Sequence, residues 1–114
     1  MEVLVRGRNV AVDADVEVSS RRKADKLPRL ASDIRRVEFE FSEIKNPRVA
    51  DAYECEVIVH LTGTFVKAHA SASDCRTALD RAVDKAEHQL GRVHDKRIHR
   101  ARPRRAGEAG AAPA

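Results

Sequence analysis

Alternating apolar and polar positions mark four segments of the chain as strands, each with one apolar face and one polar face. These segments are residues 2–7, 35–42, 53–62 and 64–72. The positions predicted to face the core are Val3, Val5, Val37, Phe39, Phe41, Tyr53, Cys55, Val57, Val59, Leu61, Val66, Ala68, Ala70 and Ala72. Gly63, between the last two segments, predicts a tight hairpin. The chain is therefore expected to form a sheet that is buried on one face.

Two further segments repeat apolar residues at helical spacing. The first follows Asp13, a good N-cap, and is expected to end or kink at Pro28, which lacks a backbone donor. The second begins at Ser73 or Asp74. Its apolar stripe is Cys75, Leu79, Ala82, Val83, Ala86, Leu90 and Val93. The small alanines of the last strand suggest a place where a helix packs closely. The order β-α-β-β-β-α predicts a two-layer α+β fold, a four-stranded sheet with two helices on one face.

Length and composition bound the class of protein. A chain of 114 residues fits one domain, which we place at residues 1–100, with residues 101–114 a basic and then Gly/Ala/Pro-rich tail or linker without ordered structure. No apolar stretch approaches the ~20 residues that a membrane helix needs. The start of the chain shows no secretion signal, and two cysteines are too few for a disulfide scaffold. We therefore expect a soluble, cytoplasmic protein.

Charge is unevenly distributed along the chain. The formal net charge is +4, yet residues 1–93 carry 16 basic and 16 acidic residues, so residues 94–114 supply the whole excess. Residues 21–36 form a second basic block. One side of the final helix is also basic, with Arg81, Lys85, His88 and Arg92 at steps of four, three and four. This segregation favours a polyanion partner. The low aromatic content of 4% argues against base stacking, so a folded RNA would be recognised by phosphate position and shape.

Four motifs, in this order along the chain, resemble those of one family. They are Gly7-Arg8-Asn9, Lys26-Leu27, Lys45-Asn46-Pro47, and the helical run from Ala78 to Lys85 followed by Glu87, Gln89 and Leu90. Their combination is similar to the ribosome hibernation promoting factor family, also called ribosome-associated inhibitor or sigma-modulation proteins. The resemblance covers about residues 2–100 and includes the same order of strands and helices.

The resemblance implies a fold similar to double-stranded-RNA-binding domains and a bacterial protein that binds the small (30S) ribosomal subunit and its rRNA at the decoding region. Such proteins block mRNA and the A- and P-site tRNAs, inhibit translation, and preserve idle ribosomes in stationary phase or stress. The resemblance implies no enzyme activity, cofactor, small-molecule substrate or membrane contact. The residues expected to bind rRNA are Arg8, Arg22, Lys23, Lys26, Arg29, Arg81, Lys85, His88, Arg92, Lys96, Arg97 and Arg100.

The chain departs from the family pattern at two positions. Pro28 stands where relatives have a helix-compatible residue, which leaves the aim of Arg29 open, and His88 often corresponds to Arg. Long members of the family carry a further C-terminal domain that pairs two ribosomes. This chain is either a short form or the N-terminal part of a long form, and we expect ribosome dimerisation only if such a domain follows it.

Two alternatives of other kinds stay open. One is a general double-stranded-RNA-binding module with the same fold. The other, less favoured, is a small thiol-dependent enzyme that uses Cys75, because the first turn of a helix can lower the pKa of a thiol. The sequence contains no P-loop, no dinucleotide-binding glycine motif, no nucleophile elbow and no H-E-x-x-H zinc motif. A binding protein is therefore favoured over an enzyme.

Overall fold

The computed structural model describes residues 1–101, with side chains described for residues 1–97. The elements are β1 (Glu2–Gly7), α1 (Ala14–Lys26), the short 3-10 helix η1 (Leu27–Arg29), β2 (Arg36–Glu43), β3 (Tyr53–Leu61), β4 (Thr64–Ala72) and α2 (Cys75–Ala101). The predicted order β-α-β-β-β-α is confirmed. Of the predicted tail, Ala101 belongs to α2, and the rest lies outside the described residues.

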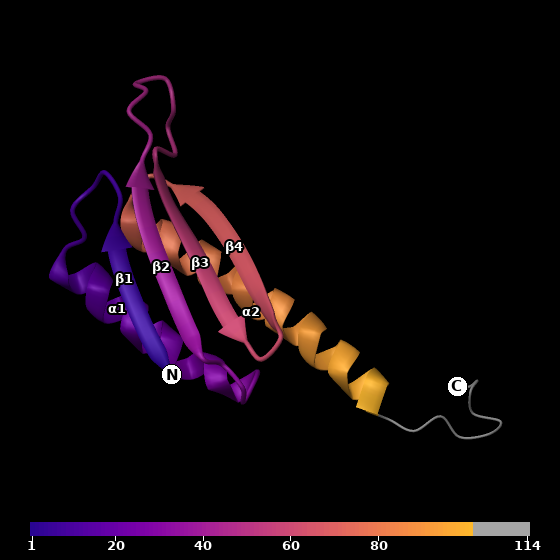
Figure 1. The fold of residues 1–114 in the computed structure, drawn as a ribbon. Coiled ribbons are helices and arrows are strands. Elements are labelled where there is room, and N and C mark those ends of the chain that lie inside the picture. Colours follow the sequence, from indigo (N-terminus) through magenta and orange to yellow (C-terminus); the bar gives the residue numbers. More distant parts are fainter. Residues whose placement is uncertain (102–114) are drawn as a thin grey trace.

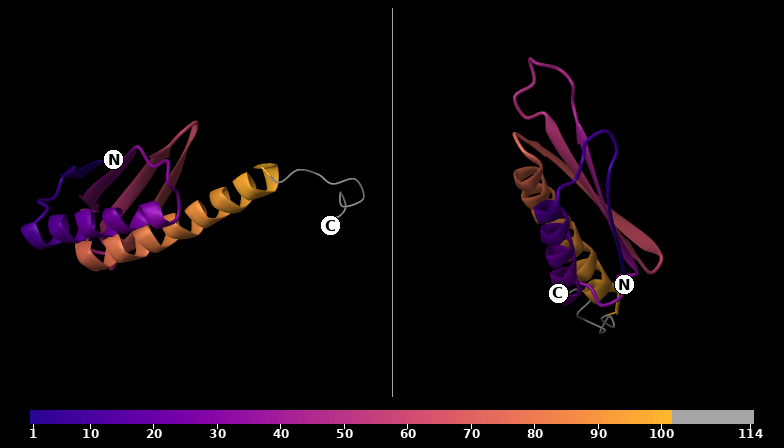
Figure 2. Two further views of the ribbon diagram at one scale, coloured as in Figure 1. Left: turned by 90° about the horizontal axis from the view of Figure 1, so that it is seen from below. Right: turned by 90° about the vertical axis from the view of Figure 1, so that its left-hand side faces the viewer.

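One four-stranded sheet, in the order β1-β2-β3-β4, forms the first layer (Figure 1). β1 runs parallel to β2, and the other neighbouring strands are antiparallel. α1 and α2 lie side by side and together form the second layer, on one face of the sheet (Figure 2). Neither helix of the described residues covers the other face. The predicted two-layer α+β fold is therefore confirmed, with β1 and β4 at the two edges of the sheet.

The core lies between the sheet and the helices. Phe39 and Phe41 of β2 are 1% and 0% exposed, and Leu79 and Leu90 of α2 are both 0% exposed. The predicted alternation holds along β2, β3 and β4, since their inward positions are buried, apart from the half-buried Tyr53 where β3 begins. α2 packs mainly against β4 and β3. The small alanines of β4 therefore mark where a helix packs closely, as expected.

Side-chain caps fix where the two helices begin. Asp13 Oδ1 accepts a hydrogen bond from Val16 N at 2.9 Å, which caps α1 as predicted. For α2 the sequence left Ser73 or Asp74 open. Asp74 is the cap, because its Oδ1 accepts from Thr77 N at 2.7 Å and its Oδ2 from Thr77 Oγ1 at 3.1 Å.

Pro28 shapes the end of the first helix. α1 ends at Lys26, and the chain continues through η1. Pro28 has no backbone N–H, and none is needed in the first turn of this short helix. The change of geometry keeps Leu27 fully buried and Arg29 on the surface. At the hairpin between β3 and β4, Gly63 has a φ of +77°, a value that a residue with a side chain rarely adopts. Both expected breaks are confirmed.

Candidate nucleic-acid interface

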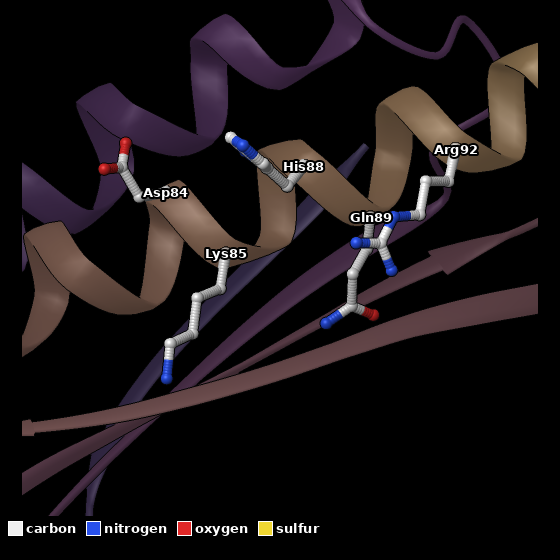
Figure 3. Close-up of a pocket in the computed structure, with 5 residues that line it drawn as sticks. All are labelled: Asp84, Lys85, His88, Gln89 and Arg92. Carbon is white, nitrogen blue, oxygen red and sulfur yellow. The ribbon is translucent and has the colours of Figure 1, made fainter.

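Four cationic side chains and His88 follow one another along α2. All five side chains are exposed and recur at steps of three or four residues, and they are Arg81, Lys85, His88, Arg92 and Lys96. From Arg81 to Lys96 the row spans about 22 Å at a rise of 1.5 Å per residue. A shallow groove of about 390 Å³ lies in the middle of this row. In Figure 3, Lys85, Gln89 and Arg92 point toward the sheet, whereas Asp84 and His88 point away from it.

Three side chains of this helix are hydrogen-bonded to the backbone of β4. The bonds join Arg81 Nη1 to Ser71 O at 2.9 Å, Lys85 Nζ to His69 O at 3.0 Å, and Gln89 Nε2 to Lys67 O at 2.9 Å. One bond uses only part of the donor capacity of an ammonium or a guanidinium group. Arg81 and Lys85 are therefore held in place and still present donors to an anion.

The cations of α1 and η1 fall into two groups, those paired with carboxylates of α2 and those without an ion pair. Lys23 Nζ lies 2.9 Å from Asp80 Oδ1, and Arg29 of η1 lies 3.0 Å from Glu87 Oε2, so both cations join the first helical segment to α2. Within the described part of the chain, Arg22 and Lys26 form no ion pair. Their charges are the ones that α1 leaves available to a partner.

Arg97 is held by a cluster near the hairpin. Its Nη1 donates to Asp33 Oδ1 at 2.7 Å, and Thr62 N donates to Asp33 Oδ2 at 3.0 Å. The bond from Arg97 is the largest cause that lowers the pKa of Asp33 to about 2, and the same bond raises the pKa of Arg97. The expected role of Arg97 in rRNA binding thus competes with this ion pair. Arg100 lies in α2, but its side chain is outside the described residues.

Arg8 stands apart from the cations of the helices. It follows β1 and lines a depression on the open face of the sheet, together with Glu40, Glu54, Glu56 and His69. Asn9, its neighbour in the Gly-Arg-Asn turn, anchors the turn, because its side chain exchanges two hydrogen bonds with the backbone of Glu43. The structure therefore does not bring Arg8 together with the row on α2.

Charges on the open face of the sheet are paired with one another. The close contacts are Arg6 with Glu40 (3.1 Å), Arg36 with Glu2 (3.3 Å), Lys67 with Glu56 (3.4 Å), His60 with Glu38 (2.5 Å) and His69 with Glu54 (3.7 Å). Glu2, Glu40 and Glu56 thus each have an arginine or lysine beside them. By contrast, His88, Arg92 and Lys96 of α2 form no ion pair within residues 1–97. Arg92 and Lys96 of the helical layer thus carry positive charge that no ion pair within residues 1–97 compensates.

The sequence motif includes Gln89, but sequence reasoning assigned it no contact, because its side chain is uncharged and it lies among the cations of α2. The signal that could have found it is its spacing, one helical turn after Lys85. Asp80 of α2 binds Lys23 of α1 and Glu87 binds Arg29 of η1, whereas Asp84 is exposed and lines the groove.

The prediction that the helix N-terminus lowers the pKa of Cys75 is wrong. Burial raises the pKa of its thiol, and the carboxylates of Asp13, Asp74 and Glu43 raise it further. Burial also raises the pKa of Cys55 to about 12. Neither thiol is favoured as a thiolate near neutral pH, so the thiol-dependent enzyme loses its premise.

Two features are absent from the described residues. No group of His, Cys, Asp and Glu side chains there could hold a metal ion. Neither of the described helices has the length and apolar composition needed to cross a membrane.

The sequence and the fold of this chain are similar to those of known proteins. Residues 3–98 match the family described as "Sigma 54 modulation protein / S30EA ribosomal protein". The structure is similar to the Protein Y N-terminal domain of Thermus thermophilus, with a TM-score of 0.68 and 26% identity over 82% of this chain and 99% of that one. It also shares its fold with a ribosomal subunit interface protein from Coxiella burnetii, with a TM-score of 0.72 and 18% identity over 83% and 99% of the chains. No curated protein matches significantly by sequence.

The four-stranded sheet, covered on one face by two helices, defines the class as a small two-layer α+β domain. The match over residues 3–98 identifies the family, and the chain belongs to the sigma-54 modulation and S30EA family of ribosome hibernation factors. The resemblance seen in the sequence motifs is therefore confirmed.

Proposed function

We propose that this chain is a hibernation factor that binds the small ribosomal subunit at the decoding region. It occupies the path of mRNA and of the A- and P-site tRNAs there, inhibits translation and preserves idle ribosomes. The action takes place in the cytoplasm and involves no catalysed reaction. The observation that carries the proposal is a group of cations on the helical layer of a member of this family: Arg22, Lys26, Lys85, Arg92 and Lys96 form no ion pair within residues 1–97, whereas Arg6 and Lys67 of the open sheet face are paired with glutamates.

The physics of such binding follows from the residues available. Arg92 and Lys96 of α2, together with Arg22 and Lys26 of α1, can neutralise phosphates and release their counterions. All four aromatic residues lie in strands, and Phe39 and Phe41 are buried in the core. The helical layer therefore offers donors and shape to RNA without a surface on which bases stack.

Sedimentation with separated ribosomal subunits tests the proposal. We expect the protein to travel with small subunits at moderate salt, to be absent from large subunits, and to lose binding steeply as salt rises. Prior loading of mRNA and tRNA should reduce its binding, because all three occupy the same path. The variant Lys85→Glu/Arg92→Glu should sediment alone.

A plain RNA duplex separates this proposal from the general RNA-binding module. Equal affinity for the duplex and for small subunits would favour the module and overturn the hibernation role. Failure to sediment with small subunits, or unchanged binding in the presence of mRNA and tRNA, would also contradict the proposal.

A further inference from the structure

β4 is an edge strand of the sheet, and its outward backbone groups have a role apart from the proposed RNA binding. It is the last strand in the sheet order, and its pairing with β3 is continuous from Thr64 to Ala72. In an antiparallel strand, the N–H and C=O groups of alternate residues point away from the neighbouring strand. An edge of this length without proline or a bulge is a template for another strand.

α2 covers that edge with a regular row of donors. Arg81, Lys85 and Gln89 follow one another at one helical turn, about 6 Å apart. Their acceptors are the outward carbonyls of every second residue of β4, about 6.8 Å apart. Because the two repeats nearly match, one α2 side chain reaches each of three successive outward carbonyls.

The opposite edge is protected by the same kind of contact. Arg21 of α1 donates from Nη1 to the backbone carbonyl of Val3 in β1 at 3.2 Å, and Glu17 holds its guanidinium at 3.3 Å. Each edge strand therefore receives at least one cationic side chain from the helix that lies beside it. This repetition indicates a role in the sheet that is separate from RNA binding.

We propose that Arg81, Lys85 and Gln89, here called the edge row, keep β4 from pairing with β4 of a second copy of this chain. A second copy is the occupant that fits, because two β4 strands related by a two-fold axis keep the same alternation of inward and outward residues. The small inward side chains of Ala68 and Ala70 would continue the apolar face across the join. In the native protein, the edge rows of two copies would also bring like charges together.

A matched pair of triple variants tests the proposal. Arg81→Ala/Lys85→Ala/Gln89→Ala removes the edge row, whereas His88→Ala/Arg92→Ala/Lys96→Ala removes three polar side chains of the same helix that form no hydrogen bond to β4. Sedimentation equilibrium measures the mass across a range of protein concentrations. We expect the first variant to approach twice the monomer mass at high concentration, and the wild type and the second variant to stay monomeric.

A proline then locates the interface. The Lys67 carbonyl accepts from Gln89, so its N–H also points outward, and Lys67→Pro removes a donor that the β3–β4 ladder does not use. Added to the edge-row variant, Lys67→Pro should return it to the monomer. Circular dichroism and urea unfolding check that each variant is folded.

Three results would overturn the proposal. They are a folded edge-row variant that stays monomeric at all concentrations, equal dimerisation of the control variant, and a dimer that persists after Lys67→Pro. If the triple variant does not fold, Lys85→Ala/Gln89→Ala keeps Arg81 in place and is judged by the same three results.

Discussion

Arg92 and Lys96 offer the sharpest test of the cationic side of α2. Both side chains are exposed and take part in no ion pair within the described residues, so alanine at either position removes charge without breaking an internal contact. They lie one turn apart, about 6 Å, which exceeds the spacing of charges along a nucleic-acid strand. The double variant Arg92→Ala/Lys96→Ala should therefore remove two phosphate contacts.

The size of the effect follows from counterion release. Each phosphate contact contributes about −0.7 to −0.9 to the slope of log K against log salt. Two lost contacts should make the slope shallower by about 1.4–1.8. If the variant and the wild type bind equally at ~1 M salt, this change in slope weakens binding of the variant by about 14- to 30-fold at ~0.15 M salt.

The assay titrates fluorescently labelled protein with purified small subunits at four monovalent salt concentrations and one fixed Mg²⁺ concentration. Arg36→Ala is the matched control, because it removes the same kind of charge from the open face of the sheet, where Arg36 is paired with Glu2. The control should leave the slope unchanged. A double variant with the wild-type slope would show that this side of α2 does not touch phosphates, and would refute the reasoning.

Two further predictions concern stability and reactivity. The folded-state pKa of Asp33 is lowered to about 2, chiefly by its bond with Arg97, so the pair stabilises the fold fully above the ordinary value of 3.8 and loses this effect as pH falls through about 2. In urea unfolding at neutral pH, the free energy of unfolding of the wild type should exceed that of Asp33→Asn by about 0.5–1 kcal/mol, and this difference should close toward pH 2. A difference that stays constant with pH would contradict this. Burial and nearby carboxylates raise the pKa of Cys75, so iodoacetamide should alkylate it more slowly at pH 7.5 than in the urea-unfolded chain. Faster alkylation in the folded protein would refute that cause.

Much of the fold could be predicted because its signals are local. The alternation along β2 depends on neighbouring residues that point to opposite faces, and burial of Phe39 and Phe41 follows directly from it. Asp13 caps α1 through an atom three residues away. Pro28 ends regular α-helix wherever it stands inside one. Each of these signals involves residues within one turn of helix or a few residues of strand.

The candidate site was predictable only as a set of charges. Lys85 and Arg92 were assigned to one side of α2 from spacing alone, and the structure places them there. Spacing could not distinguish Lys23, which binds Asp80, from its neighbour Arg22, which forms no ion pair in the described part of the chain. That difference depends on which side of α1 meets α2.

By itself the sequence determined the order of the elements, the buried faces and the family, because these depend on short-range periodicity and on a few motifs in fixed order. Only the tertiary structure decided which cations remain available to a partner. Arg97 meets Asp33 across 64 positions of sequence, and Lys85 meets the carbonyl of His69 because α2 lies along the edge of β4. The physical reason is that a side chain bonds to whatever packing brings within about 3 Å.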